Sequence, residues 1–179
     1  HLISLHERIQ INRKHINNTA ISNFINLYKK DIIDLSCTFF EVMTVLAITH
    51  FQNNNVDVAI LETGLGGEFD SVTACNPCLQ LFTSISKDHM HILGNDIKDI
   101  ATTKAKAMKF EIPCLSVLQT NEVKGILDYY AKINSTQINY YENKVNFQTT
   151  LIGSHQNQNI NLAIEAAKYL TSINEKNIS

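Results

Sequence analysis

The chain has 179 residues, of which 44% are hydrophobic and 18% are charged, and its formal net charge at pH 7 is −2. This length can bury one sizeable hydrophobic core, so we expect one domain or a large part of one. The balanced charge and the lack of a basic run argue against a nucleic-acid partner. Polar residues interrupt every apolar stretch before it is long enough to cross a bilayer, which argues against a membrane partner.

Two helices are predicted in the first third of the chain. Residues 19–30 place four large apolar side chains on one helical face: Ile21, Phe24, Ile25 and Tyr28. Thr38 is a predicted N-cap of the second helix, and Glu41 three residues later would complete a capping box. This helix should run through Ile48 and end near residues 53–55.

Strand patterns then alternate with helix patterns. Strands are expected at residues 56–61, 79–83 and 113–118, and two more that could form a hairpin at 138–150. Helices are expected at residues 96–109, 121–131 and 155–170. The first should bury Ile97, Ile100, Ala101, Ala105 and Met108. The last should bury Ile160, Ala163, Ile164 and Ala167. Such alternation is typical of an α/β fold with a mostly parallel sheet and helices on both faces. We expect residues 1–170 to form it and residues 171–179 to be a tail or linker.

The four cysteines do not make a disulfide framework. Cys75 and Cys78 have the spacing of half a zinc or redox site, but the sequence holds no second pair to complete four ligands. We therefore expect reduced thiols in a cytoplasmic protein.

A glycine turn, Leu61-Glu62-Thr63-Gly64-Leu65-Gly66-Gly67, follows the first predicted strand. A carboxylate at the end of a parallel strand lies where ligands bind, and glycines let backbone approach such a ligand closely. A carboxylate there needs a cationic partner, for which Mg²⁺ held together with substrate phosphates is a natural candidate. An N-cap or an ion pair is the alternative for Glu62, and the glycines match a dinucleotide fingerprint only loosely.

Two further polar residues follow in order. His89 comes after Asp88 at the exit of the second predicted strand and can ligate a metal, although a solvated or structural histidine is the alternative. Lys104 lies among small residues of a predicted helix. A divalent ion would repel its ammonium, so it must contact phosphate directly or become an anionic carbamate, unless it is a partly buried surface lysine. Glu62, His89 and Lys104 together predict a magnesium–nucleotide site.

Here the sequence resembles a known family, folylpolyglutamate synthase/dihydrofolate synthase, a branch of the Mur ligase superfamily. Besides the three residues above, the matching positions are His1-Leu2, Glu7-Arg8-Ile9, Thr38-Phe39-Phe40-Glu41, Thr44, Leu61, Gly64-Leu65-Gly66-Gly67, Asp70, Thr83-Ser84-Ile85, Asp88, Leu93-Gly94, Ile100-Ala101, Ala105, Pro113 and Gly153-x-His155-Gln156-x-x-Asn159. The resemblance implies that residues 1–170 are part of a P-loop-type central ATPase domain, incomplete here, and that residues 171–179 lead toward a C-terminal domain.

The resemblance also implies roles for single residues. Residues matching Glu62 and His89 hold magnesium ions that bridge the ATP phosphates in the family, and the carbamylated lysine matching Lys104 helps to hold the second ion. These three are the predicted catalytic and metal-binding residues. The aromatic residue matching Phe40 lies at the pterin site. The asparagine matching Asn159 faces the adenine, and we assign His155 to the same nucleotide-binding set.

The implied reaction is amide formation with ATP and Mg²⁺ as cofactors. ATP phosphorylates a carboxylate of dihydropteroate or of a folate, and the amine of L-glutamate then attacks the acyl phosphate. We expect only these small-molecule partners and a monomeric protein. Another Mur-type amide ligase and a non-catalytic remnant are the alternatives.

Several features depart from the family pattern. The family's phosphate loop would lie upstream of His1 and its C-terminal domain beyond Ser179, so we expect a fragment without detectable glutamate ligation on its own. Glu68 stands where the family usually has arginine and reverses a charge near the expected phosphates. Lys106 replaces a usual glycine, and Ser86-Lys87 replaces Gly-Leu before Asp-His. None of these changes removes a predicted metal ligand.

Overall fold

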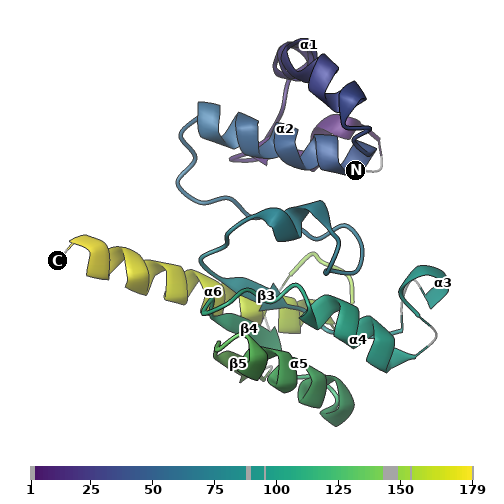
Figure 1. Cartoon of the computed structure of the whole chain (residues 1–179). Helices are drawn as coiled ribbons and strands as arrows, with labels where there is room; N and C mark the ends of the chain where they lie inside the picture. Colours follow the sequence, from purple (N-terminus) through teal and green to yellow (C-terminus); the bar gives the residue numbers. More distant parts are fainter. Residues whose placement is uncertain (1–2, 88–89, 95, 143–148, 154, 179) are drawn as a thin grey trace. The chain divides into compact units, whose positions relative to one another are not determined.

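The computed structural model describes residues 3–87, 90–94, 96–142, 149–153 and 155–178 (Figure 1). The chain divides into two compact units, unit 1 over His1–Gly64 and unit 2 over Leu65–Ser179. Within the described ranges, no helix combines the length and hydrophobicity needed to cross a lipid bilayer.

Unit 1 begins with a short 3₁₀ helix, η1 (Leu5–Arg8), and a small hairpin of β1 (Gln10–Ile11) and β2 (Lys14–His15). The strands are antiparallel, and the two residues between them, Asn12 and Arg13, both have positive φ. This is the backbone of a two-residue hairpin turn, whose twist matches that of the flanking strands.

Two helices complete the core of unit 1: α1 (Asn18–Asp34) and α2 (Phe39–Asn53). The predicted capping box is confirmed, because the Glu41 amide donates to Thr38 Oγ1 at 3.3 Å and the Thr38 amide donates to Glu41 Oε2 at 2.7 Å. Hydrogen bonds from Thr38 lower the pKa of Glu41. The buried apolar side chains of this unit come from the hairpin region and both helices: Ile9, Ile16, Phe24, Met43, Leu46 and Ala47.

The strand predicted at residues 56–61 is wrong. This segment has no strand structure, and its residues 57–60 are solvent-exposed, with Ile60 at 88%. A strand needs a neighbour to bond with, and neither sheet in the described part of the chain includes these residues. The β-branched residues Val56, Val58 and Ile60 give this segment a high strand propensity, but no neighbouring strand among the described residues pairs with it.

Unit 2 contains a parallel sheet in the order β3-β4-β5, formed by β3 (Gln80–Phe82), β4 (Cys114–Val117) and β5 (Ile138–Tyr141). The connecting elements are η2 (Ser71–Ala74), α3 (Met90–Leu93), α4 (Ile97–Ala105), α5 (Asn121–Ile133) and α6 (His155–Ile178). β4 is central and all four of its residues are buried, as expected for a strand covered on both faces.

The two faces of this sheet carry separate clusters of buried residues. On one face, α4 and α5 pack on the sheet, and their cluster consists of Phe82, Ile85, Ile100, Ala101, Ala105, Met108, Cys114, Val123, Leu127 and Ala131. On the other face, Leu162 and Ala166 of α6 pack against Leu115 and Val117 of β4. The predicted α/β fold, with a parallel sheet and helices on both faces, is confirmed.

Helix α6 differs from its prediction in two respects. The side chains that it buries are Leu162 and Ala166, whereas the predicted inward residues Ala163 and Ala167 are exposed. Apolar residues occupy a wide arc of this helix, so helical spacing alone does not select the face that meets the sheet. The helix also continues beyond Leu170 to Ile178. The linker role of residues 171–179 stays a prediction, and most of the second strand predicted at 138–150 lies outside the described residues.

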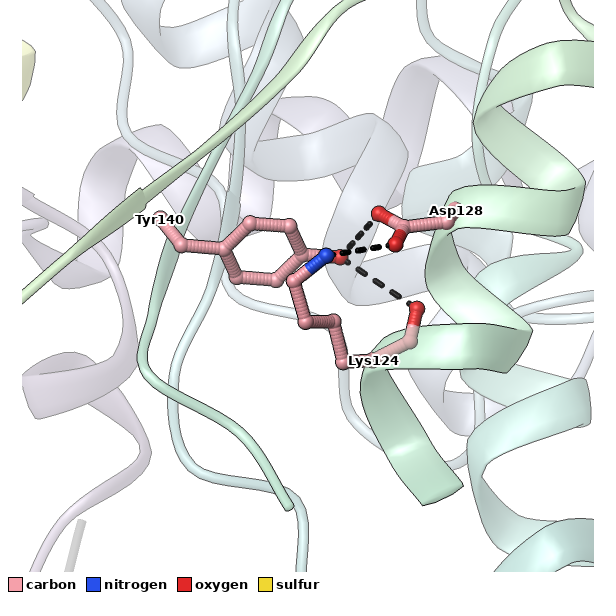
Figure 2. Close-up of polar contacts among 3 residues, drawn as sticks. All are labelled: Lys124, Asp128 and Tyr140. Atoms are coloured by element: carbon pink, nitrogen blue, oxygen red, sulfur yellow. Dashed lines mark hydrogen bonds and ion pairs between the residues drawn. The ribbon is translucent and has the colours of Figure 1, made fainter. Parts of the chain in front are cut away.

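A polar network joins β5 to α5 (Figure 2). The Tyr140 hydroxyl donates to Asp128 Oδ1 at 2.8 Å, and Lys124 Nζ donates to Asp128 Oδ2 at 2.6 Å. Lys124 Nζ also lies 4.6 Å from the centroid of the Tyr140 ring, within the range of a cation–π contact. Burial, followed by the hydrogen bond to Asp128, raises the pKa of Tyr140 well above its ordinary value.

The four cysteines are free thiols, and their exposures differ. Cys114 is fully buried in β4 and Cys78 is exposed. Burial raises the pKa of Cys114 from 9.0 to about 11. We expect iodoacetamide at pH 8 to alkylate Cys78 in the folded protein and Cys114 only after unfolding in urea, because the thiolate is the reactive form. Peptide mass spectrometry with and without urea measures this order.

The same shift predicts a pH dependence of stability. The folded state holds the Cys114 proton more tightly than the unfolded state, so this contribution is complete below pH 9 and is lost between pH 9 and about 11. A Cys114 that is alkylated as fast as Cys78 in the folded protein would contradict both expectations.

Candidate functional site

The predicted site residues are divided between the two units. Glu62 and Phe40 belong to unit 1, whereas Lys104, His155 and Asn159 belong to unit 2. His89, with Asp88, lies outside the described residues. No group of three or more His, Cys, Asp or Glu side chains in the described ranges is placed to hold a metal ion. The convergence of Glu62, His89 and Lys104 on magnesium therefore stays a prediction.

Unit 1 brings the glycine turn and Phe40 together. Phe40 lies in the first turn of α2, and a Cβ built on Gly64 would lie 2.6 Å from Cζ of its ring. No L-side chain fits there unless the ring moves, so glycine lets the backbone lie against the outer edge of the ring. Glu62, two residues earlier, is exposed. Phe40, the predicted pterin-binding residue, thus lies against Gly64, two residues after the predicted metal ligand Glu62.

Unit 2 places the next two glycines against α4, beside Lys104. A Cβ built on Gly67 would lie 2.8 Å from the Thr103 carbonyl oxygen and 3.1 Å from Cα of Lys104. Gly66 has φ +70°, and its Cβ would lie 3.0 Å from methyl carbons of Leu93 and Thr103. The sequence predicted glycines that allow close approach to a ligand, but here their smallness lets the turn pack directly on the helix.

Side chains and backbone groups hold this turn in place. The Glu68 amide donates to the Thr103 carbonyl oxygen at 3.1 Å, and Thr73 Oγ1 donates to the Gly67 carbonyl oxygen at 2.6 Å. Asp70, a residue of the family motif, accepts from the amides of Leu65 and Val72 at 3.0 Å each and is the N-cap of η2. Residues 65–70 therefore form a hydrogen-bonded segment that packs against α4 beside half-buried Lys104.

Replacing Gly67 with alanine is expected to destabilise unit 2 by about 1–3 kcal/mol, because the added methyl group meets backbone atoms that cannot rotate away. Gly125→Ala is a matched control. Gly125 lies inside α5 with no atom within 4 Å of a built Cβ, so this change should raise stability by about 0.5–1 kcal/mol. Urea denaturation of both variants tests the contrast, and equal midpoints would refute the close packing of the turn.

One polar residue at the carboxyl end of the sheet was missed in the sequence. Gln119 follows β4, and its Nε2 donates to the Thr83 carbonyl oxygen at 2.9 Å and to Ser116 Oγ at 3.1 Å. Its Oε1 accepts from the Ile85 amide at 3.1 Å. Gln119 thereby fixes the segment that leaves β3, where ligands bind in parallel sheets. A polar residue directly after a buried strand is the signal that could have identified it.

The predicted nucleotide-binding residues share the first turns of α6. His155 is its first residue and is exposed, and Asn159 lies four positions later, on the same side of the helix. Asn159 Nδ2 donates to Gln156 Oε1 at 3.4 Å, and the Gln156 amide donates to the Gly153 carbonyl oxygen at 3.1 Å. Gly153 has φ +119°, a conformation that favours glycine before the helix.

Comparison with known proteins adds an independent line of evidence. No family model matches the chain. The dihydrofolate synthase/folylpolyglutamate synthase of Bacillus subtilis is 32% identical over an alignment that covers 100% of this chain and 49% of that protein. The chain thus spans about half the length of this curated relative.

Solved structures share the fold. The apo form of Lacticaseibacillus casei folylpolyglutamate synthase aligns with a TM-score of 0.89 at 24% identity, over 98% of this chain and 50% of that one. The folylpolyglutamate synthase of Mycobacterium tuberculosis, solved with ADP and AMPPCP, aligns with a TM-score of 0.70 at 28% identity, over 78% of this chain and 34% of that one. The chain is therefore a partial-length relative of the folylpolyglutamate synthase/dihydrofolate synthase enzymes.

Proposed function

We propose that this chain contributes the metal and phosphate side of an ATP-dependent ligase that joins L-glutamate to dihydropteroate or to a folate through an acyl phosphate. The observation that carries the proposal is the similarity to the Bacillus subtilis enzyme along the whole chain. The nucleotides ADP and AMPPCP in the Mycobacterium tuberculosis structure support a nucleotide as the second ligand. The four free thiols favour a reducing compartment, and we place the protein in the cytoplasm as a monomer.

The donor chemistry fits magnesium in part. Glu62 presents an exposed carboxylate, the oxygen ligand that Mg²⁺ prefers. We assign His89 to the same set from its place in the sequence. Lys104 fits only as a carbamate, since its ammonium would repel a dication; otherwise it would contact a phosphate directly. When bound, magnesium neutralises charge on the transferring phosphoryl group.

The remaining predicted residues would bind and orient the substrates. Phe40 would stack on a pterin ring. Gly64 lets the adjacent backbone lie close to the Phe40 ring. Asn159 and His155 would face the adenine from the first turns of α6. Holding the carboxylate and the phosphoryl group in contact supplies much of the rate gain in such transfers.

The test uses the product of the complete open reading frame that carries this sequence. We expect it to consume ATP only when L-glutamate, Mg²⁺ and either dihydropteroate or a reduced folate are all present, with one phosphate released per glutamate added. Phosphate release and mass spectrometry of the pteridine product measure this stoichiometry. Turnover with other acids and amines but none with pteridines would reject the proposal.

A further inference from the structure

An ion pair links Glu68, the residue that follows the glycine turn, to the end of α4. Lys106 Nζ lies 2.8 Å from Glu68 Oε2, and the two side chains are 38% and 30% exposed. Lys106 is the C-cap of α4, and its amide donates to the Thr102 carbonyl oxygen at 3.0 Å.

This pair is one of three contacts between the same two short segments. Gly67 lies against Thr103 and Lys104, the Glu68 amide bonds the Thr103 carbonyl oxygen, and the Glu68 carboxylate bonds Lys106. The contacts fall on both sides of Lys104 in the sequence of α4. Gly67 and Glu68 are therefore held against the backbone of α4 at Lys104.

The charge balance of the turn follows from the same pair. An uncompensated carboxylate beside Lys104 would repel phosphate groups that approach this lysine. Lys106 cancels that charge at hydrogen-bond distance, and a charge-assisted bond of this length is stronger than a neutral one. The sequence alone indicated that Glu68 opposes phosphate binding, but in the structure its carboxylate is already paired.

We infer that Lys106 is a positioning residue, which neutralises Glu68 and fixes the glycine turn against α4 so that Lys104 can meet an anionic phosphate. The inference rests on the proposed function for the identity of that anion and for the direct contact between the Lys104 ammonium and phosphate. The inference predicts that positions 68 and 106 are coupled: reversing one charge alone weakens nucleotide binding, whereas reversing both charges together preserves it.

The same helix offers a matched control. Lys98 Nζ lies 3.4 Å from Glu122 Oε1, an ion pair that joins α4 to α5. Lys98→Glu makes the same charge reversal on α4 without touching the glycine turn. The change in nucleotide affinity of Lys98→Glu measures the effect of reversing one lysine charge on this helix through net charge alone.

The experiment compares wild type with Lys106→Gln, Lys106→Glu, Lys98→Glu and the exchange Glu68→Lys with Lys106→Glu, each in the complete open reading frame product. Two quantities are measured: the Kd of AMPPCP with Mg²⁺ at several salt concentrations, and hydrogen exchange of the Glu68 amide. We expect Lys106→Glu to weaken binding about ten-fold, mostly at low salt, and to lose amide protection. The affinity and amide protection of Lys106→Gln should lie between those of wild type and Lys106→Glu. The double variant Glu68→Lys with Lys106→Glu should restore both quantities.

Each outcome decides the inference. If wild type binds the nucleotide and Lys106→Glu binds as well as Lys98→Glu, the pair has no positioning role, even if stability has changed. If the exchange fails to recover the affinity lost in Lys106→Glu, the coupling is absent. If wild type does not bind the nucleotide, the proposed function fails, and amide exchange alone decides: unchanged protection of Glu68 in Lys106→Glu would then reject the fixed turn.

Discussion

Replacing Glu62 with glutamine is expected to lower kcat/KM for glutamate ligation by at least about 100-fold in the product of the complete open reading frame. The amide keeps the size of the side chain but removes the negative charge that a magnesium ligand needs. Because Glu62 is exposed, its replacement should not impair folding, so a folding defect would not explain such a loss of activity. Steady-state kinetics over a Mg²⁺ titration measure both the rate and the metal requirement.

Asp57→Asn provides the matched control for this variant. Asp57 is an exposed acid in the same segment, five positions before Glu62, and its replacement removes the same charge. We expect its kinetics to stay within about two-fold of wild type, as for most surface substitutions away from a site. If Glu62→Gln kept more than half of the activity at the normal Mg²⁺ concentration, Glu62 would not be a metal ligand.

Replacing Leu127 with alanine is expected to lower the free energy of unfolding by about 3–4 kcal/mol. Leu127 is 0% exposed in α5 and belongs to the cluster with Ile100 and Cys114 that joins two helices to the sheet. Its truncation removes apolar contacts and leaves a cavity that the β4 backbone cannot collapse to fill. Urea denaturation gives the change from the midpoint and the slope.

Ile133→Ala on the same helix is the control, because Ile133 is 54% exposed and should change stability by less than about 0.5 kcal/mol. The two variants together separate burial from helix propensity. A loss below about 1 kcal/mol for Leu127→Ala would mean that α5 does not pack on the sheet as described.

Local sequence signals predicted the helices of this chain well. The Thr38–Glu41 capping box begins α2 where expected, and Ile100, Ala101 and Ala105 of α4 are buried as predicted. α4 ends at Ala105 and not near Lys109, so Met108 is buried beyond the end of the helix. Such signals are contained within one or two turns of helix, so they do not depend on the rest of the fold. The end of α6 was missed because its apolar spacing fades after Leu170 while its residues remain compatible with helix.

Pairing over long sequence distances could not be predicted in the same way. The segment 56–61 had strand propensity without a pairing partner in the described sheets. The bond between Lys106 and Glu68 spans 38 positions, and those from Gln119 to Thr83 and Ile85 span 36 and 34. The sequence identified the candidate site residues by type and order, but these supporting contacts depend on how α4 and β4 meet the loops.

The network of Tyr140, Asp128 and Lys124 has a consequence for how the sheet opens (Figure 2). β5 has one bonded neighbour, β4, within the described sheet. Peeling that strand away would also break the bonds from the Tyr140 hydroxyl to Asp128 and to the Lys124 carbonyl oxygen. Fraying of the border strand therefore costs side-chain bonds to α5 in addition to its ladder bonds with β4, which makes local opening at this margin less favourable.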